Sequence, residues 1–238
     1  MFYKTIFVLL ALIYSQHSVA QCQVNANELK AQYQVSNEAN SGKKTKHMLT
    51  LYRHHNDVAY QYNNQGISEY WHQQHNGLID LTRYFDHDKQ GIEYQASEIK
   101  NKQSWQQIMQ LISPKLRQKM QLISERENAC QLEQKLQLIE GKKEILLTWL
   151  PQIKLVKKLT IITPTQTKHW QLLQLSTGAE KVAEQFAKWQ RYKTTDYADV
   201  GDNEDDPFLA KMINLGFVEH AASGFYQANG QAIAAEHH

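Results

Sequence analysis

The stretch KHMLTLYRHHNDVAYQYNNQGISEYWHQQHNGLIDLTRYFDHDKQGIEY, residues Lys46–Tyr94, is a series of short strand patterns separated by turn residues. Asn-rich and Gly-containing gaps between such runs are a strong hairpin signal, because tight turns need residues that accept positive φ. The pattern predicts an antiparallel meander. Its five strands are expected at His47–Arg53, Val58–Tyr62, Ile67–Gln73, Leu78–Phe85 and Ile92–Tyr94.

A second block, from Cys130 to Ser176, repeats this organisation with four more expected strands. Several strands of the first block carry apolar or aromatic residues on both faces, so the sheet needs cover on both sides or a ligand on one. We predict an α+β fold: one curved antiparallel β-sheet, an open half-barrel, with helices packed on one face. The second-block strands are expected at Cys130–Leu138, Ile145–Leu150, Leu155–Thr163 and Lys168–Ser176.

A helical insertion is predicted over about 103–124, between the two blocks. Ser104 suits an N-cap, and Ser113-Pro114 restarts a helix with proline at its tolerated first position. The apolar stripe then continues from one helix into the next. Its residues are Trp105, Ile108, Met109, Ile112, Leu116, Met120 and Ile123. A last helix is expected over Ala179–Tyr192.

The N-terminus has the features of a secretory signal peptide over 1–20. Lys4 is its basic residue, and Ile6–Tyr14 is an apolar run too short to span a bilayer. Small residues in Ser18-Val19-Ala20 place cleavage after Ala20, which predicts a periplasmic protein; the alternative is a membrane anchor.

The remaining chain is divided by composition. We expect an N-terminal arm at 21–44 and a single β-rich domain at 45–192. The arm is predicted to hold a short helix over Val24–Val35, on the Leu29–Tyr33 spacing, followed by a loop over Ser36–Lys44. An acidic loop with a short helix is expected at 193–217, and a disordered tail at 218–238.

Cys22 and Cys130 are the two cysteines of the chain. In an oxidising compartment an even pair indicates one disulfide, which we expect between them. Two free or buried thiols are the alternative. Cys22 also raises a lipoprotein interpretation, for which Gln21 is a poor preceding residue.

The chain has a formal net charge of +2 over 238 residues and a mean hydropathy of −0.61. This balance predicts a protein that is not integral to the membrane, and it argues against nucleic acid as a partner. No phosphate loop, Gly-x-Ser-x-Gly or haem-attachment motif is found. We therefore expect no cofactor and no catalytic residue.

Two groups of polar residues are candidate metal ligands. The carboxylates between Asp196 and Asp206 either bind a cation or cap helices, with Asp206 as the N-cap before Pro207. Adjacent residues of a strand point to opposite faces, so His54 and His55 are not expected to serve one site without a bulge. We assign no metal ligand.

The order of signal peptide, strand meander, helical insertion, second meander and helix resembles the periplasmic lipoprotein carriers and outer-membrane lipoprotein receptors (LolA/LolB-like). The strand pair Leu146–Pro151 and Leu155–Ile162 is similar to one in that family. The resemblance covers about 46–177 and implies an open curved sheet that binds acyl chains beneath a helical lid. The tail from Asp196 to Phe208 also resembles a block of uncharacterised secreted proteins of Gram-negative bacteria.

We therefore expect a non-enzymatic periplasmic carrier that binds a lipid or acyl chain between sheet and helices. The residues expected to line the site are Tyr70, Trp71, Trp105, Ile108, Met109 and Trp149. The alternative is a cell-envelope adaptor that holds a protein partner by a sheet edge or by the acidic tail. A metal-dependent enzyme would need three converging His or carboxylate side chains.

Overall fold

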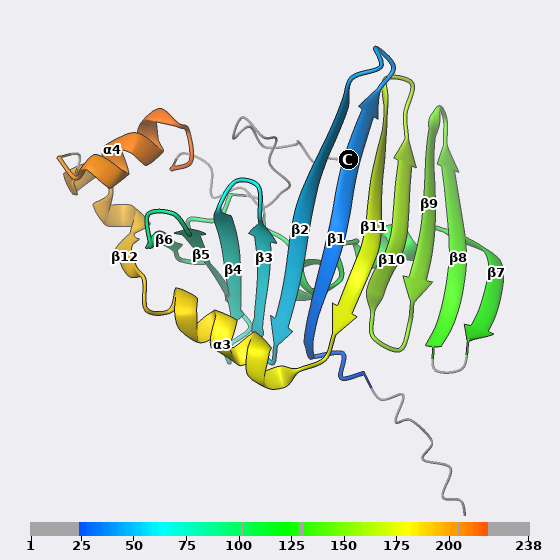
Figure 1. Ribbon diagram of the computed structural model, residues 1–238, viewed down its shortest axis with the longest axis horizontal. Coiled ribbons are helices and arrows are strands. Elements are labelled where there is room, and N and C mark those ends of the chain that lie inside the picture. The colour runs from blue at the N-terminus through cyan, green and yellow to red at the C-terminus, as the bar shows by residue number, and fades with distance from the viewer. Residues whose placement is uncertain (1–23, 101, 129–130, 204, 219–238) are drawn as a thin grey trace, which may run out of the picture.

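The computed structural model describes residues 24–218 except 101, 129–130 and 204, and places all described strands in one 12-stranded sheet (Figure 1). The strands are β1 Glu28–Ala39, β2 Lys44–His54, β3 Asp57–Tyr62, β4 Ile67–Gln73, β5 Ile79–Phe85, β6 Gln90–Tyr94, β7 Gln121–Asn128, β8 Gln131–Glu140, β9 Lys143–Leu150, β10 Leu155–Ile162, β11 Gln166–Ser176 and β12 Lys193–Asp196. The helices are α1 Trp105–Gln110, α2 Pro114–Gln118, α3 Ala179–Trp189 and α4 Pro207–Asn214, with 3-10 turns η1 Tyr197–Asp199 and η2 Gly201–Asn203.

The strand order is β12-β6-β5-β4-β3-β2-β1-β11-β10-β9-β8-β7. Two meanders therefore share one sheet, and β1 joins them by pairing with β2 on one side and β11 on the other. All of these pairs are antiparallel except β12 with β6, which is parallel. The predicted α+β fold with a large, mostly antiparallel sheet is confirmed.

β1 corrects the prediction for the start of the chain. The helix expected over Val24–Val35 is wrong, and the loop expected from Ser36 is wrong as far as Ala39. Every second residue of β1 is buried, which is the period of a strand. The buried side chains are Leu29, Ala31, Tyr33 and Val35. A spacing of four residues, as between Leu29 and Tyr33, fits both a helix and a strand and did not discriminate.

The helical insertion is shorter than predicted. Ser104 is the N-cap of α1 and accepts from the Gln107 amide, and Pro114 begins α2, both as expected. The helical pattern ends at Gln118, however, and residues from Gln121 form β7. Met120 thus lies in the link between α2 and β7, and Ile123 belongs to an edge strand, where one side of the backbone has no strand neighbour among the described residues.

Each face of the sheet carries helices and its own apolar cluster. We call the face under α1 and α2 the α1 face; it includes Trp71 and Trp149 and also receives α4 through Phe208. We call the opposite face the α3 face, where Tyr52 and Tyr84 pack against α3. Figure 1 shows α3 crossing in front of the strands, with α1 and α2 behind them.

A single carboxylate fixes the end of α3. The Trp189 indole Nε1 donates to Asp86 Oδ1 over 2.9 Å, and the Ser68 hydroxyl donates to Asp86 Oδ2 over 2.9 Å. The Tyr52 and Trp189 rings meet edge-on with centroids 5.5 Å apart.

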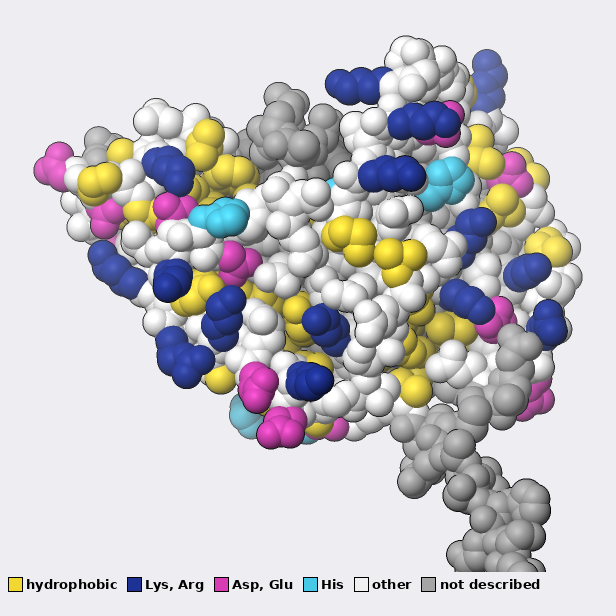
Figure 2. Space-filling view, viewed as in Figure 1, with side chains coloured by type: hydrophobic (Ala, Val, Ile, Leu, Met, Phe, Trp, Pro, Cys, Tyr) yellow, Lys and Arg dark blue, Asp and Glu magenta, His cyan; other side chains and the backbone are white. Residues whose placement is uncertain are grey.

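Lys and Arg side chains are interspersed with Asp and Glu over this side of the molecule, as Figure 2 shows.

The acidic segment caps local structure. Asp206 accepts from the amides of Phe208 and Leu209 at the start of α4, as its position before Pro207 predicted. Asp196 accepts from the Ala198 amide at the start of η1. Gly216 follows α4 with φ of 71°, the conformation expected of a glycine after a helix.

No helix of the described residues is long and apolar enough to cross a membrane. The predicted signal peptide over 1–20 and both cysteines, Cys22 and Cys130, lie outside the described residues. Their cleavage and pairing remain predictions.

Candidate functional site

Residues Trp105–Gln118, which contain α1 and α2, lie against the α1 face and are called the cover segment below. Its apolar side chains point into the cluster beneath it: Ile108 and Ile112 are 1% and 4% exposed. Trp105 and Met109 are half-buried against the same cluster. The cover segment therefore fills the space between itself and the sheet with its own side chains.

A buried arginine ties the cover segment to the sheet. The Arg53 guanidinium, near the end of β2, is fully buried and donates to the Met109 carbonyl of α1. It also donates to the carbonyls of Ala26, Ile153 and Lys154 at 3.0, 2.8 and 2.8 Å. These four acceptors are all backbone carbonyls, and they come from three separate segments of the chain. Burial lowers the pKa of Arg53 to about 10, so the group stays charged at neutral pH.

Two buried tyrosines lie beside this arginine on the α1 face. The Tyr60 hydroxyl donates to the Ile108 carbonyl, one residue before the carbonyl bound by Arg53. The Tyr33 hydroxyl donates to the Val156 carbonyl of β10 over 2.8 Å. Burial raises the pKa of both tyrosines, so both remain donors at neutral pH. The last carbonyls of a short helix have no partner within the helix, and here the sheet supplies donors for two of them.

The second helix of the cover segment rests on a tryptophan. The Arg117 guanidinium of α2 lies 4.9 Å from the centroid of the Trp149 ring in β9. Trp149 itself is 2% exposed. A cation over an aromatic face contributes about 0.5–2 kcal/mol, depending on desolvation. The cover segment is therefore attached at both of its helices.

Five of the six residues predicted to line a ligand site meet on the α1 face. Trp71 and Trp149 are contributed by the sheet, and the other three belong to the cover segment. Tyr70 is not with them, because neighbours in a strand point to opposite faces. It packs against the α3 cluster and donates to Asp57 Oδ1 over 2.8 Å.

The Trp71 side chain has an unusual environment. Its indole is 2% exposed, yet Nε1 has no hydrogen-bond partner among the described residues. Leaving such a donor unpaired costs about 1–3 kcal/mol. Trp71 of β4 is the register partner of Val58 in β3, and Val58 is the register partner of Arg53 in β2. Trp71 and Arg53 therefore lie in the same cross-strand row.

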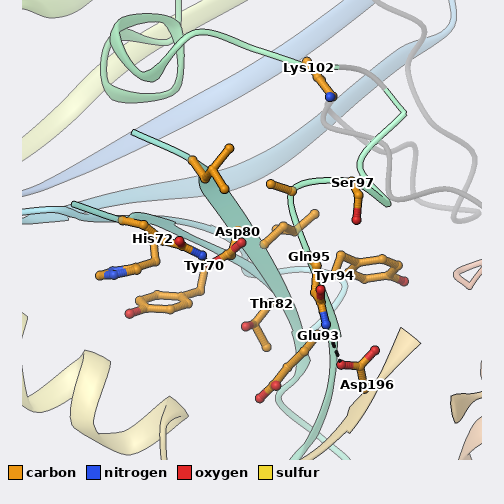
Figure 3. Close-up of a pocket in the computed structure, with 14 residues that line it drawn as sticks. Tyr70, His72, Asp80, Thr82, Glu93, Tyr94, Gln95, Ser97, Lys102 and Asp196 are labelled. Atoms are coloured by element: carbon orange, nitrogen blue, oxygen red, sulfur yellow. Dashed lines mark hydrogen bonds between the residues drawn. The ribbon is translucent and has the colours of Figure 1, made fainter. Parts of the chain in front are cut away.

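A pocket of about 690 Å³ lies elsewhere, at the ends of β4, β5 and β6 (Figure 3). It is lined by Tyr70 and Glu93 of the sheet, by the loop after β6 and by Asp196 of β12. Gln95 Nε2 donates to Asp196 Oδ2 across it over 3.3 Å. No residue of the cover segment is among its lining residues, and of the six residues predicted to line the apolar site only Tyr70 lines this pocket.

Another buried polar pair on the α1 face was not found from the sequence. Arg83 Nη2 lies 3.0 Å from Glu69 Oε1, and the two side chains are 0% and 1% exposed. Arg83 Nη1 also donates to the Phe217 carbonyl over 2.6 Å. Opposed charges at cross-strand positions of neighbouring strands were the available signal, because Glu69 and Arg83 are register partners.

One group of possible metal ligands occurs within the described part of the chain: Glu28, His54 and His55. The expectation that His54 and His55 need a bulge to serve one site is wrong, because His55 lies outside the strand. His55 leaves the strand with φ of 55°, and this left-handed turn brings its ring to 4.5 Å from the His54 ring, centroid to centroid.

No family model matches the sequence, and the search of curated proteins found no relative. Among solved structures, the chain is similar to an uncharacterized conserved protein from Thermus thermophilus, with 8% identity, a TM-score of 0.40, and coverage of 71% of this chain and 91% of that one. It is similar to a LolA superfamily protein from Nitrosomonas europaea, with 8% identity, a TM-score of 0.32, and coverage of 66% and 89%. It is also similar to a chain of the Pseudomonas aeruginosa MucA/MucB complex, with 14% identity, a TM-score of 0.32, and coverage of 66% and 56%. A LolA superfamily protein is thus among the similar structures, as the sequence resemblance predicted.

Proposed function

We propose that this protein is a non-enzymatic periplasmic carrier that binds a hydrophobic ligand, such as an acyl chain, between the cover segment and the α1 face of the sheet. One observation carries the proposal. Two short helices cover a broad apolar face, and buried polar side chains, Arg53 and Tyr60, hold the end of the first helix by its carbonyls.

The cover segment is suited to exchange with a ligand. Helices of six and five residues are too short to be stable alone, so the conformation of this segment depends on its docking. If the segment moves away, Ile108 and Ile112 leave the apolar cluster that they share with Trp71 and Trp149. An acyl chain could then take the place of these side chains against the sheet. Removing the acyl chain from water would contribute about 0.8 kcal/mol of binding free energy per buried methylene.

The same face offers a partner for the polar end of an acyl ligand. The Trp71 Nε1 donor has no partner among the described residues. Arg53 would lose one of its four acceptors, the Met109 carbonyl, if the cover segment moved away. We expect an ester or carboxylate oxygen of the ligand to accept from Trp71 Nε1. The proposal therefore favours a ligand with one polar end and a long apolar body over a pure hydrocarbon.

The first test is native mass spectrometry of the mature protein purified from its own periplasm, beside a denatured control. We expect a bound mass in the lipid range that disappears on denaturation. A second test titrates the delipidated protein with a dansyl-labelled fatty acid. Met109→Lys should weaken binding about tenfold or more, because it places a charge in the apolar site.

Leu173→Lys is the matched control for that titration. Leu173 is 54% exposed on β11, outside the cover segment, so the same substitution should leave probe binding unchanged. A protein that purifies without a bound mass and does not bind the probe would contradict the carrier. Equal binding by the two lysine variants would place the ligand elsewhere.

The adaptor remains a second candidate because one edge of the described sheet is free. β7 ends the strand order, and Leu122 and Ile123 in it are 51% and 54% exposed. An unpaired edge with apolar side chains suits addition of a strand from a partner. A photo-crosslinking residue at Ile123, compared with one at Leu173, should then capture a specific envelope protein only from Ile123.

A further inference from the structure

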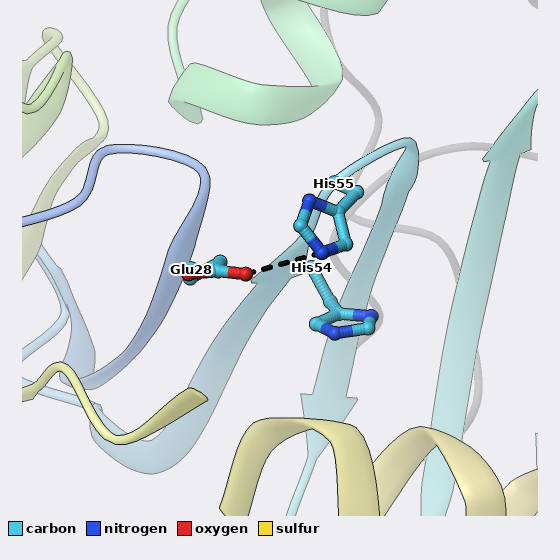
Figure 4. A group of neighbouring side chains, drawn as sticks. All are labelled: Glu28, His54 and His55. Atoms are coloured by element: carbon cyan, nitrogen blue, oxygen red, sulfur yellow. Dashed lines mark ion pairs between the residues drawn. The ribbon is translucent and has the colours of Figure 1, made fainter. Parts of the chain in front are cut away.

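Three metal-ligating side chains converge where β1 begins and β2 ends (Figure 4). One ligand atom from each of Glu28, His54 and His55 lies within 4.8 Å of the others. Glu28 Oε1 and His55 Nε2 are 3.1 Å apart, and Figure 4 shows them directed at each other, with the His54 ring below them. The group is on the α3 side of the sheet, so it is independent of the proposed carrier site.

The backbone dictates this convergence. Glu28 and His54 are register partners in the β1–β2 pair, so their side chains stand next to each other on one face. His55 follows in the turn with φ of 55°, and its amide donates to the Asn27 carbonyl over 3.1 Å. Two strand partners and one turn residue thus present three ligands from rigid positions.

Neighbouring groups orient the ligands. Asn25 Nδ2 donates to Glu28 Oε2 over 2.8 Å, which leaves Oε1 directed at the histidines. The His54 ring stacks on Phe186 of α3, with centroids 5.9 Å apart and planes inclined by 28°. Hydrogen bonds and packing behind the ligands are typical of functional metal sites, where they fix ligand geometry.

We propose that Glu28, His54 and His55 bind a divalent transition-metal ion of the Zn²⁺ class. Two imidazoles and one carboxylate are a recurrent zinc ligand set, with the remaining position open to water. Imidazole ligands favour Zn²⁺, Ni²⁺ or Cu²⁺, whereas Mg²⁺ and Ca²⁺ are bound by sets of oxygen ligands, which this group does not provide. The bound ion would link the start of β1 to the β2–β3 turn.

Binding is tested with ZnCl₂ and tag-free mature protein by isothermal titration calorimetry and thermal melting. We expect about one Zn²⁺ per chain and a higher melting temperature with metal. His55→Asn removes the imidazole while keeping a residue that tolerates positive φ, and Glu28→Gln keeps the side-chain shape. Each should weaken zinc binding about tenfold or more, with little change in the melting temperature without metal.

The chain supplies a matched control, because it has a second adjacent pair, His237-His238. A His237→Ala/His238→Ala variant should bind Zn²⁺ as the unmodified protein does. The proposal is overturned if zinc binding is lost in that variant, if His55→Asn and Glu28→Gln bind as tightly as the parent, or if the parent shows no binding. Each of these outcomes leaves the carrier proposal unaffected, because none involves the cover segment.

Discussion

Tyr60 and Arg53 bind consecutive backbone carbonyls of α1, those of Ile108 and Met109. Both donors are on the sheet and both acceptors belong to the cover segment, so the pair joins two parts of the protein that are distant in sequence. The apolar contacts of Ile108 could be made by many side chains. The carbonyl bonds, in contrast, require these donors at these positions.

Tyr60→Phe should therefore loosen the cover segment selectively. The substitution removes one hydroxyl and leaves the Ile108 carbonyl without that donor, at a cost of about 1 kcal/mol. We expect amide hydrogens of residues 105–118 to exchange about fivefold faster, while those of β1 and β2 stay protected. Hydrogen-exchange mass spectrometry measures both regions in one experiment.

Tyr33→Phe is the control for this prediction. It also removes a buried hydroxyl bonded to a backbone carbonyl on the α1 face, but its acceptor is Val156 of β10. It should lower global stability by a similar amount without a selective effect on residues 105–118. If the two variants give the same exchange pattern, Tyr60 does not hold the cover segment.

Glu69→Gln should strongly destabilise the fold. The substitution leaves the Arg83 charge buried without its carboxylate, which costs about 3–5 kcal/mol. Glu38→Gln breaks the exposed Glu38–Lys44 pair, 2.8 Å apart, and should cost less than about 1 kcal/mol. Urea unfolding followed by tryptophan fluorescence compares the two. A small effect of Glu69→Gln would mean that Arg83 is satisfied by its other partners.

Gly66→Ala should be more harmful than Gly141→Ala, although both glycines have positive φ, at 64° and 59°. A methyl group at Gly66 would collide with the His87 ring, whereas nothing lies within 4 Å of the corresponding position at Gly141. We expect about 1 kcal/mol of backbone strain at either glycine, and at Gly66 a further cost for displacing the exposed His87 ring. Equal melting temperatures for the two variants would exclude the clash with His87.

The capping of α4 should depend on pH. Hydrogen bonds from the amides of Phe208 and Leu209, and nearby Lys193, hold the pKa of Asp206 below its ordinary value of 3.8. A carboxylate with a lowered folded pKa contributes stability above its unfolded pKa, and loses it as the pH falls through the folded value. Asp206→Asn should therefore narrow the difference in melting temperature between about pH 5 and about pH 2. An unchanged difference would show that Asp206 does not contribute to it.

Turn chemistry explains why the meanders could be predicted from sequence. β3 and β4 begin within one residue of their expected starts and end where expected, because Asn63–Gly66 and His75–Gly77 interrupt alternating patterns. The turn expected at Glu140–Lys142 also lies between β8 and β9, although β8 ends two residues later and β9 begins two residues earlier than expected. Glycines with positive φ stand in all three turns, so local sequence indicates where the chain reverses direction.

The remaining errors have a common physical origin. The apolar spacing of β1 fits both a helix and a strand, and β7 follows α2 without a helix-terminating glycine, so the pattern did not separate helix from strand at either place. Likewise, Arg53 and Tyr60 act on backbone carbonyls, which have no sequence signature. For the site, sequence reasoning correctly grouped Trp71, Trp149 and the cover segment on one face. It wrongly added Tyr70, which the alternation of side chains along a strand places on the opposite face from Trp71.

The position of β1 has a consequence for how the chain acquires its fold. Its pairing with β2 is local, but its other edge pairs Lys30 with Ser176, so that edge stays exposed until nearly all of the strands have been synthesised. Contacts of such sequence separation slow folding, and an open strand edge is prone to intermolecular pairing. Newly made chains would therefore be most vulnerable to aggregation before β11 emerges, and a chaperone that protects extended segments would act in that interval.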